Sequence, residues 1–540
     1  MPAGMRWYVA WLAGVWLGGV PAGSFGQGAP DLSELRVRVG LLRERTTELA
    51  GTDDLLDTLH FGWFYRPYAR ATLAVLVKIT GVLEREVRLR EMGNGAISDS
   101  ALTDMLSWAQ EALGRIVAPE AEHDFRPHRL GFVPADISSE GAAPSLFGFV
   151  DQATATRHDR RFGELDLMMA AGLRVYPRLL SDLKPATLDS VLFDRAGTLG
   201  ALVVAAGVLN EASSGDSPDA WAAFPSDRVL VVEPVRLRAA LGAAAERSVD
   251  AGHAAALVDS TSPESVGGWL ARRGLARGMG GGTRYIIDSW QPPAVSQPLD
   301  ARAAATAAAM WIDAFEGEAL GLMHGWRDFR DGSGSLHPSL FSEPAYIETV
   351  AITALDIMRL TSYVARFRER PDLLIRVGTD AVDEHNDNAW AEWTEPVWEA
   401  LLQRHIRFDI TAQRGMADKR AQDRYRLVVS LGREDGSGVA AFVRGVEDQL
   451  AGRREDAAPP LVREQDGSPA GSLYVRQWRT LDGRPCAAIV NLSGEGRRLS
   501  LYTQPALGAA KDMIHDEVVK APEKATTLAA WQVRLLWPVD

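Results

Sequence analysis

Four short apolar runs of the chain each end in a carboxylate. The runs LFGFVD, RVLVVE, AAALVD and RYIID end at Asp151, Glu233, Asp259 and Asp288. Hydrolysis of a glycosidic bond requires two carboxyl groups, one protonated as the acid and one ionised as the nucleophile or base. The set therefore indicates a two-carboxylate site, with Glu233 and Asp288 as the catalytic pair and Asp151 and Asp259 as substrate-binding neighbours.

Each of these carboxylates also has a structural interpretation. A carboxylate at the end of a strand can cap the helix that follows it, or it can pair with a buried arginine. For any single one of the four, both interpretations stay open.

The elements that must position these residues are strands and helices in alternation. Short runs of β-branched or aromatic residues bounded by turn residues are typical of buried strands. Between residues 128 and 370 they alternate with helix-like segments, which predicts a parallel sheet of the length of a (β/α)8 barrel. In such a barrel the carboxyl ends of the strands meet at one cleft. The run LGALVVAAGVL, at 199–209, favours a helix.

A second cluster follows the run ALGLM. His324, Trp326, Arg327 and Asp328 come directly after this predicted strand, at its carboxyl end. A tryptophan can form a platform for a sugar ring, and arginine and aspartate can bind hydroxyl groups. The alternative is an Arg–Asp pair that only braces a loop. Glu318 precedes the same strand and is assigned to the opposite, structural face.

Length and composition bound the class of protein. The chain has 540 residues, of which 46% are hydrophobic and 24% charged, as in a soluble globular protein of three or more domains. Its net charge of −13 argues against nucleic acid or an anionic membrane as the main partner. Cys486, the one cysteine, excludes an intramolecular disulfide and is predicted to be a small core residue.

The N-terminus is typical of an export signal. Arg6 precedes an apolar stretch that ends in Val20-x-Ala22, a pattern of small residues that predicts cleavage of a signal peptide at 1–22. We therefore expect a periplasmic or extracellular protein without stable membrane insertion after cleavage. The alternative is an uncleaved membrane anchor.

An α-helical module is predicted over 31–120. Its helices lie near 32–50, 70–91 and 102–117, with Ser98 or Asp99 as the N-cap of the third. Pro67 is expected to lie outside the second helix.

Two further domains are predicted after the barrel. The pattern over residues 371–455 predicts a second α/β unit. Residues 470–540 contain short strand-like runs with turns between them, which favours an antiparallel β-sandwich. Within the barrel, Gly172 is expected to end a helix that begins near residue 162.

No motif in the sequence predicts a metal site or a cofactor. The chain lacks a G-x-S-x-G elbow, a Walker loop, H-E-x-x-H and C-x-x-C. The glycine-rich stretch at 278–283 is interpreted as a turn, because it precedes a strand and lacks the third glycine of a dinucleotide loop. Aspartates at strand ends could still hold Ca²⁺ or Mg²⁺.

The layout resembles the family-42 β-galactosidases and their relatives among the retaining (β/α)8 glycosidases. The stretches that carry the resemblance begin at WRDFRDGSGSLHPSLF, LLIRVGTDAVDEHNDNAW and LYVRQWRTLDGRPCAAIVNLSG, and together they extend it over about 128–540. The resemblance implies a barrel, a flavodoxin-like domain and a C-terminal β-sandwich, with a dimer or trimer as the assembly.

The resemblance also implies catalytic residues. An acid/base glutamate is expected after the fourth strand and a nucleophilic glutamate after the seventh, which matches Glu233 and Asp288. The chain departs from this pattern, because Val232 stands where the family usually has asparagine and Asp288 stands in place of glutamate. Glu211, which follows Asn210, is the alternative acid.

Two other functions remain open from the sequence. A barrel that binds carbohydrate without cleaving it would rely on Trp290 and Trp326, and a structural protein of the cell envelope would need no pocket at the strand ends. In all but the last case the expected partner is a carbohydrate.

Overall fold

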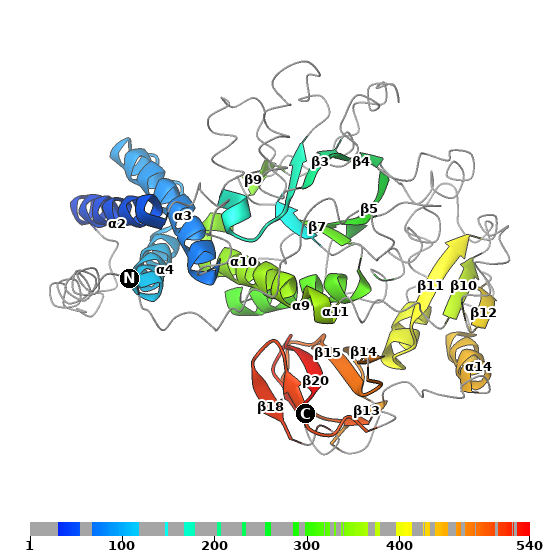
Figure 1. The fold of residues 1–540 in the computed structure, drawn as a ribbon. Helices are drawn as coiled ribbons and strands as arrows, with labels where there is room; N and C mark the ends of the chain where they lie inside the picture. Colours follow the sequence, from blue (N-terminus) through cyan, green and yellow to red (C-terminus); the bar gives the residue numbers. More distant parts are fainter. Residues whose placement is uncertain are drawn as a thin grey trace. The chain divides into compact units, whose positions relative to one another are not determined.

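The structure is a computed structural model of the 540-residue chain (Figure 1). It describes residues 31–53, 67–117, 146–149, 167–178, 202–206, 229–233, 254–260, 270, 285–290, 298–317, 319–323, 329–330, 336–337, 340–364, 373–377, 396–412, 425, 427–431, 438–451, 461–465, 470–480, 482–502, 506–520, 522 and 526–539. The predicted signal peptide lies outside these residues. The domain boundaries named above stay predictions.

The described residues belong to two compact units. One contains residues 31–53, 67–117, 167–173, 329–330, 336–337 and 340–355, and the other contains the remaining described segments. Stretches far apart in the sequence thus fold together in the first unit.

The three predicted N-terminal helices are present. They are α2 (Leu32–Asp53), α3 (Pro67–Glu91) and α4 (Asp99–Val117). Ser98 caps α4, because its Oγ accepts a hydrogen bond from the N–H of Ala101 at 3.3 Å. The prediction that Pro67 lies outside its helix is wrong. Pro67 is the first residue of α3, where its missing N–H has no partner to lose.

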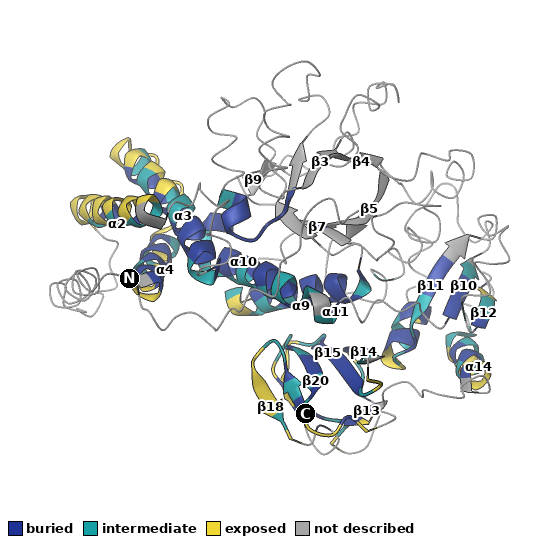
Figure 2. Cartoon of the chain, in the orientation of Figure 1, coloured by how far each residue is buried: buried dark blue, intermediate teal, exposed yellow. Residues whose placement is uncertain are grey.

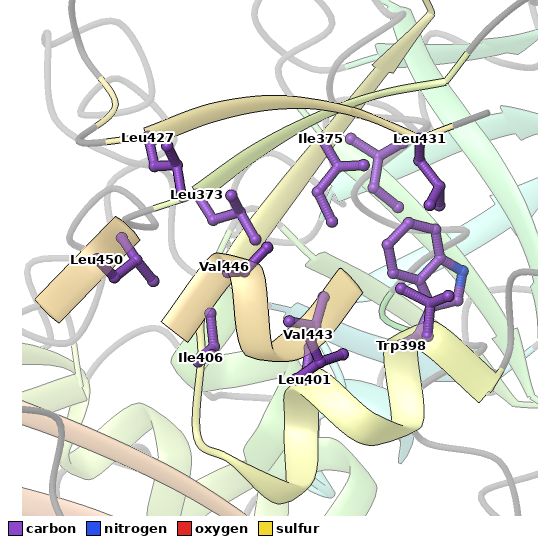
Figure 3. Packing of buried hydrophobic residues seen from close by; sticks show 12 residues of the cluster. Leu373, Ile375, Trp398, Leu401, Ile406, Leu427, Leu431, Val443, Val446 and Leu450 are labelled. Atoms are coloured by element: carbon purple, nitrogen blue, oxygen red, sulfur yellow. The ribbon is translucent and has the colours of Figure 1, made fainter. Parts of the chain in front are cut away.

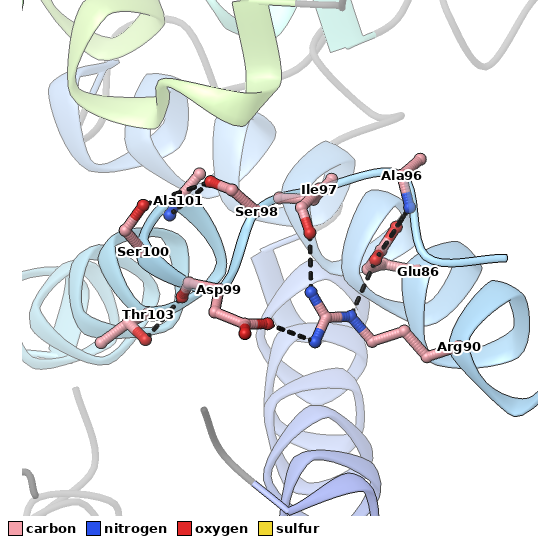
Figure 4. Close-up of polar contacts among 9 residues, drawn as sticks. All are labelled: Glu86, Arg90, Ala96, Ile97, Ser98, Asp99, Ser100, Ala101 and Thr103. Carbon is pink, nitrogen blue, oxygen red and sulfur yellow. Dashed lines mark hydrogen bonds and ion pairs between the residues drawn. The ribbon is translucent and has the colours of Figure 1, made fainter. Parts of the chain in front are cut away.

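An ion pair between Arg90 and the exposed Asp99 joins the end of α3 to the start of α4 (Figure 4). Arg90 donates to Glu86 Oε1 at 2.8 Å, to the carbonyl of Ile97 at 2.6 Å and to Asp99 Oδ1 at 2.6 Å. Glu86 is fully buried and also accepts from the N–H of Ala96. The hydrogen bond to Asp99 is the main cause that raises the pKa of Arg90.

Helix α10 (Pro344–Arg359) begins in the same unit as these helices. Its buried Glu348 accepts hydrogen bonds from Thr72 Oγ1 at 2.7 Å and Trp108 Nε1 at 3.0 Å, and it pairs with Arg115 at 2.8 Å. One carboxylate therefore connects α3, α4 and α10.

Gly172 ends the helix at 167–170, as predicted. Its φ is +79°, and the N–H groups of Gly172 and Leu173 bond to the carbonyls of Met169 and Met168. This is the Schellman arrangement, which favours glycine at the left-handed position.

Seven described strands close into a parallel barrel in chain order. They are β1 (Leu146–Phe149), β2 (Val175–Arg178), β3 (Leu202–Ala206), β4 (Val229–Glu233), β5 (Ala254–Ser260), β6 (Tyr285–Trp290) and β7 (Ala319–Met323). Strand β1 pairs with both β2 and β7, which completes the ring. Helix α9 (Leu299–Glu316), with many buried alanines, directly precedes β7.

The prediction of a helix at 199–209 is wrong. Residues 202–206 form strand β3, which pairs with β2 on one side and β4 on the other. The alanines made the run look helical, but a position between two strands requires extended backbone, and tertiary pairing overrides a weak local preference.

Short elements follow the barrel strands along the chain. A two-stranded antiparallel ribbon pairs β8 (Phe329–Arg330) with β9 (Leu336–His337). A turn of 3₁₀ helix (Leu340–Ser342) precedes α10, and α11 (Thr361–Val364) follows it.

A three-stranded parallel sheet follows, in the order β11–β10–β12. Its strands are β10 (Leu373–Val377), β11 (Phe408–Ala412) and β12 (Leu427–Leu431), and the helices at 396–403 and α14 (Val439–Ala451) accompany them. Fully buried Trp398 packs with Leu401, Ile375 and Val443 between strands and helices (Figure 3). The mixed strands and helices expected over 371–455 are present.

The C-terminal strands form two antiparallel sheets, β13–β16–β19 and β14–β15–β20–β17–β18. The strands are β13 (Leu461–Glu464), β14 (Leu473–Arg479), β15 (Pro485–Asn491), β16 (Arg497–Tyr502), β17 (Ala510–Asp512), β18 (Glu517–Val519), β19 (Thr526–Leu528) and β20 (Val533–Pro538). One hydrophobic core draws on both sheets, including Leu499 from one and Ile489 from the other. Cys486 is fully buried in β15, as predicted for a core residue.

Burial follows the elements closely (Figure 2). Helix α2 buries Leu35, Val39 and Leu42 on one face, while Val37 and Leu41 stay exposed on another. Among the described residues, no helix combines the length and the apolar character that crossing a membrane requires.

Candidate functional site

The strand registers place the two predicted catalytic carboxylates in defined rows of the barrel. Glu233, the last residue of β4, is level with Ala256 of β5, which is level with Ile286 of β6. Asp288 lies two positions beyond Ile286 on the same strand. Because successive residues of a strand alternate between its two faces, Glu233 and Asp288 belong to the same face of the barrel sheet.

We name this face the charged face. It consists of Glu233, Asp288 and the strand residues that are level with them or an even number of positions away. Six of the seven strands end on it, in the residues Phe149, Arg178, Glu233, Ser260, Trp290 and Met323. Since all seven strands are parallel, these six residues form the rim at the carboxyl ends of the strands.

The opposite face of the same strands is mostly aliphatic. Its residues include Leu146, Val175, Leu202, Val204, Leu230, Val232, Leu257, Ile287, Leu320 and Leu322. Asp259 belongs to this aliphatic face, because it is level with Ser289, the residue after Asp288. The alternation therefore separates Asp259 from the predicted catalytic pair.

The order of the strands changes the assignment of Asp288. Glu233 ends the fourth barrel strand, where the acid/base residue is expected. Asp288 lies on β6, the sixth strand, and not on the seventh. The difference arises because only β5 lies between β4 and β6, so two strand-to-strand steps, and not three, separate Glu233 from Asp288.

Several predicted site residues lie outside the described residues. They are Asp151, Glu211, His324, Trp326, Arg327 and Asp328. Their roles stay predictions.

The register adds a residue that the sequence analysis missed. Arg178 ends β2 on the charged face, level with Ala205 of β3, which is level with Val231 of β4. An arginine on this face adds a fixed positive charge to the rim. The rule that identified Glu233, a charged residue at the end of an apolar run, would also have found Arg178 in the run LRVYPRLL.

Other buried ionisable groups have structural partners. Asp512 of β17 is fully buried and accepts from the N–H groups of Ile514 and Leu535. His515 bonds to the same carboxylate at 2.8 Å, and this hydrogen bond is the main cause that raises the pKa of the imidazole. Burial alone lowers the pKa of Arg174 to about 10, so its guanidinium stays charged at neutral pH.

The described residues form no recognisable metal-binding site. In that part of the chain, no three His, Cys, Asp or Glu side chains come together as a metal-binding group.

Comparisons with solved structures give distant likenesses. No family model matches the chain, and no curated protein sequence does either. The structure is similar to that of the apo exo-carrageenase GH42 from Bacteroides ovatus, with a TM-score of 0.41 and 10% sequence identity, over 94% of this chain and 99% of that one. A TM-score below 0.5 does not establish a shared fold, so the barrel rests on its own strand registers.

Proposed function

We propose that this protein is an exported glycoside hydrolase that acts on a carbohydrate through Glu233 and Asp288. The proposal takes the barrel as a variant of the (β/α)8 type, followed by a flavodoxin-like domain and a C-terminal β-sandwich. The observation that carries it is the shared face of the two carboxylates in a closed parallel barrel, with Glu233 at a strand's carboxyl end.

The charged face is the barrel interior in this proposal. In a parallel barrel one face is covered by helices and is rich in Leu, Ile and Val, whereas polar residues at strand ends project into the ligand site. The aliphatic face has the first composition. The charged face has the second, since Arg178, Glu233 and Asp288 all belong to it.

The two carboxylates take different roles. Glu233 donates a proton to the glycosidic oxygen as the bond breaks, and Asp288 acts as the ionised group, either as nucleophile or as base for a water molecule.

Hydrolysis of a panel of 4-nitrophenyl glycosides tests this assignment. We expect Glu233→Gln and Asp288→Asn each to lower kcat/KM by about 10²–10⁴-fold, the range of a lost acid–base or nucleophilic group. Asp259→Asn is the matched control, since it removes a strand-end carboxylate from the other face, and we expect less than about a tenfold change. Equal losses in all three variants would show that the face assignment is wrong.

The leaving group separates the two roles. A 2,4-dinitrophenyl glycoside departs without protonation, so cleavage by Glu233→Gln should recover toward the wild-type rate on this substrate. Cleavage by Asp288→Asn should not recover. If the wild type hydrolyses nothing but binds a glycan, the protein is a carbohydrate-binding barrel instead.

Export is a separate part of the proposal. It predicts that the mature protein begins directly after Ala22, which N-terminal sequencing of the secreted or periplasmic chain measures. A mature chain that still contains residues 7–20 supports the membrane-anchor alternative.

A further inference from the structure

The three-stranded sheet β11–β10–β12 has two faces of different character. The helix at 396–403 and α14 pack on the same face, where Ile375 of β10 shares one hydrophobic core with Trp398 and Val443 of these helices (Figure 3). Because successive residues of a strand alternate between its faces, the strand residues next to this core belong to the opposite face. We name it the polar face of the sheet, and its residues are Leu374, Arg376, Asp409, Thr411, Val428 and Ser430.

Three residues of the polar face form one row across the strands. Arg376 of β10, the central strand, is level with Thr411 of β11 and with Ser430 of β12. Each of them is the last residue but one of its strand, so the row lies at the carboxyl ends. Neighbouring strands lie about 4.8 Å apart, and a ligand held at Arg376 would therefore lie next to both hydroxyl-bearing positions.

The topology of the sheet points to the same end. The chain passes from β10 to β11 on one side and then to β12 on the other side of β10. The strand order thus reverses at β10. In open parallel sheets, ligands bind outside the carboxyl ends of the strands at such a reversal. Arg376 is therefore the charged residue of the row at the position where a ligand is expected.

The guanidinium of Arg376 has donor capacity that the described residues do not use. Arg376 is partly buried, and its Nε is buried without a hydrogen-bond partner in the described part of the chain. Asp409 belongs to the same face, two positions earlier on β11, and it accepts a hydrogen bond from Tyr425 Oη at 2.9 Å. A buried donor of a charged group is costly without an acceptor, so an acceptor oxygen from a ligand would offset that cost.

We propose that this row is a binding site for a small oxyanion, that is, a carboxylate, phosphate or sulfate group. The planar guanidinium of Arg376 can donate to two oxygens of such a group at once. The exposed Ser430 adds a hydroxyl donor on one side, and Thr411 occupies the matching position on the other. The site is independent of the proposed glycosidase activity, because it uses neither of the barrel carboxylates.

Thermal melting of the full chain in chloride, acetate, phosphate and sulfate, at equal ionic strength, tests the proposal. An anion that binds only the folded chain raises Tm as its concentration increases. Sulfate and phosphate also stabilise proteins without a specific site, so the difference between the wild type and the variants decides. A rise with acetate alone identifies a carboxylate ligand, and a rise with phosphate or sulfate identifies a tetrahedral one.

Three variants measure the contribution of the row. In Arg376→Gln the anion-specific rise in Tm should disappear, and calorimetric titration with the most effective anion should show a Kd at least about tenfold higher, the effect of a lost charge-assisted hydrogen bond. Arg376→Lys keeps the charge without the planar fork and should restore only part of the affinity. Ser430→Ala should raise Kd about threefold.

Arg404→Gln is the matched control. It removes the same charge from the same part of the chain, at a partly exposed ion pair with Glu447, and should bind the anion as the wild type does. Equal rises in Tm in all proteins, or no rise beyond that in chloride, overturn the site. If Arg376→Gln does not fold, unchanged affinity in both Arg376→Lys and Ser430→Ala overturns it instead.

Discussion

At the scale of single residues, His405 combines an unusual backbone conformation with a mostly buried ring. Its φ is +55°, and it follows the helix at 396–403, with its N–H bonded to the carbonyl of Leu402. Burial is the main cause that lowers the pKa of its imidazole to about 4, and among the described residues its Nδ1 has no hydrogen-bond partner. The folded protein therefore holds His405 neutral.

This depressed pKa predicts a dependence of stability on pH. Between pH 6.5 and 4 the unfolded chain binds a proton at His405 that the folded chain does not, so stability is complete above 6.5 and falls as the pH drops through this window. We expect a loss of about 1–2 kcal/mol after allowance for partial exposure of the ring. Urea unfolding at pH 7 and pH 4.5 measures it.

Asparagine is the matched replacement, since it tolerates the left-handed conformation and does not titrate. The difference between the wild type and His405→Asn should shrink or reverse at pH 4.5. An identical pH dependence of both proteins would assign the effect to other groups.

The strand-end carboxylates show how far a sequence determines a site at this scale. Each apolar run correctly marked a strand that ends at or near a carboxylate, as for Glu233 and Asp288. Which carboxylates share a face depends on the register between strands, and a shift by one residue exchanges the faces. Registers are long-range pairings, so the sequence alone could not separate Asp259 from Asp288.

At the scale of elements, Glu348 connects three helices through one buried carboxylate. We expect Glu348→Ala to lower the free energy of unfolding by about 3 kcal/mol, because Thr72 and Trp108 are buried donors that would lose their acceptor. Glu111→Ala is the control, since Glu111 of α4 is exposed and accepts a hydrogen bond from the exposed Ser107 at 3.3 Å. Urea unfolding compares the two, and equal, small losses would contradict the structural role.

Gly172 allows a second prediction about an element. A Cβ at this position would lie 2.9 Å from two carbons of Leu355, at a φ of +79°. Gly172→Ala should therefore destabilise the protein by about 2–4 kcal/mol, from overpacking and the left-handed conformation. Gly81→Ala in α3, where no atom lies within 4 Å, should instead stabilise it by up to about 1 kcal/mol. Thermal melting measures both, and a neutral Gly172→Ala would contradict the prediction.

Strand β3 shows why the sequence pattern at 199–209 predicted a helix wrongly. Its residues 202–206 are Leu, Val, Val, Ala and Ala, and the flanking run continues with the same small and apolar types. A short apolar run that is buried on both faces has no periodicity of two, so it cannot be distinguished from a buried helix by pattern alone. The long helices α3 and α4 were predictable, because their apolar residues recur at helical spacing over many turns.

At the scale of the whole molecule, one buried network links α9, which precedes the last barrel strand, to β14 of the C-terminal sheets. Arg476 donates to Tyr474 Oη at 2.6 Å and pairs with Glu316, and Tyr474 donates to Glu316 at 2.7 Å. Phe315 stacks on Tyr474 with ring centroids 6.3 Å apart. Removal of one partner leaves a buried charge without compensation.

We therefore expect Arg476→Met to destabilise the link by about 3 kcal/mol and to produce a low-temperature shoulder in calorimetric melting. Replacing Glu316 by Gln in the same chain should recover part of the loss, since the unpaired charge is then removed. Arg484→Ala, at an exposed ion pair with Asp482, should leave a single transition. A single, unshifted transition in Arg476→Met would show that the network does not couple these parts.

The contacts of Glu348 also have a consequence for the order in which the chain is made. Its partners Thr72 and Trp108 precede it by 276 and 240 residues. At about 5–20 residues per second, α3 and α4 leave the ribosome roughly 10–50 s before α10 exists. During that interval the donors that will meet Glu348 lack their acceptor, so the contacts of α3 and α4 with Glu348 cannot form until 348 of the 540 residues have been synthesised.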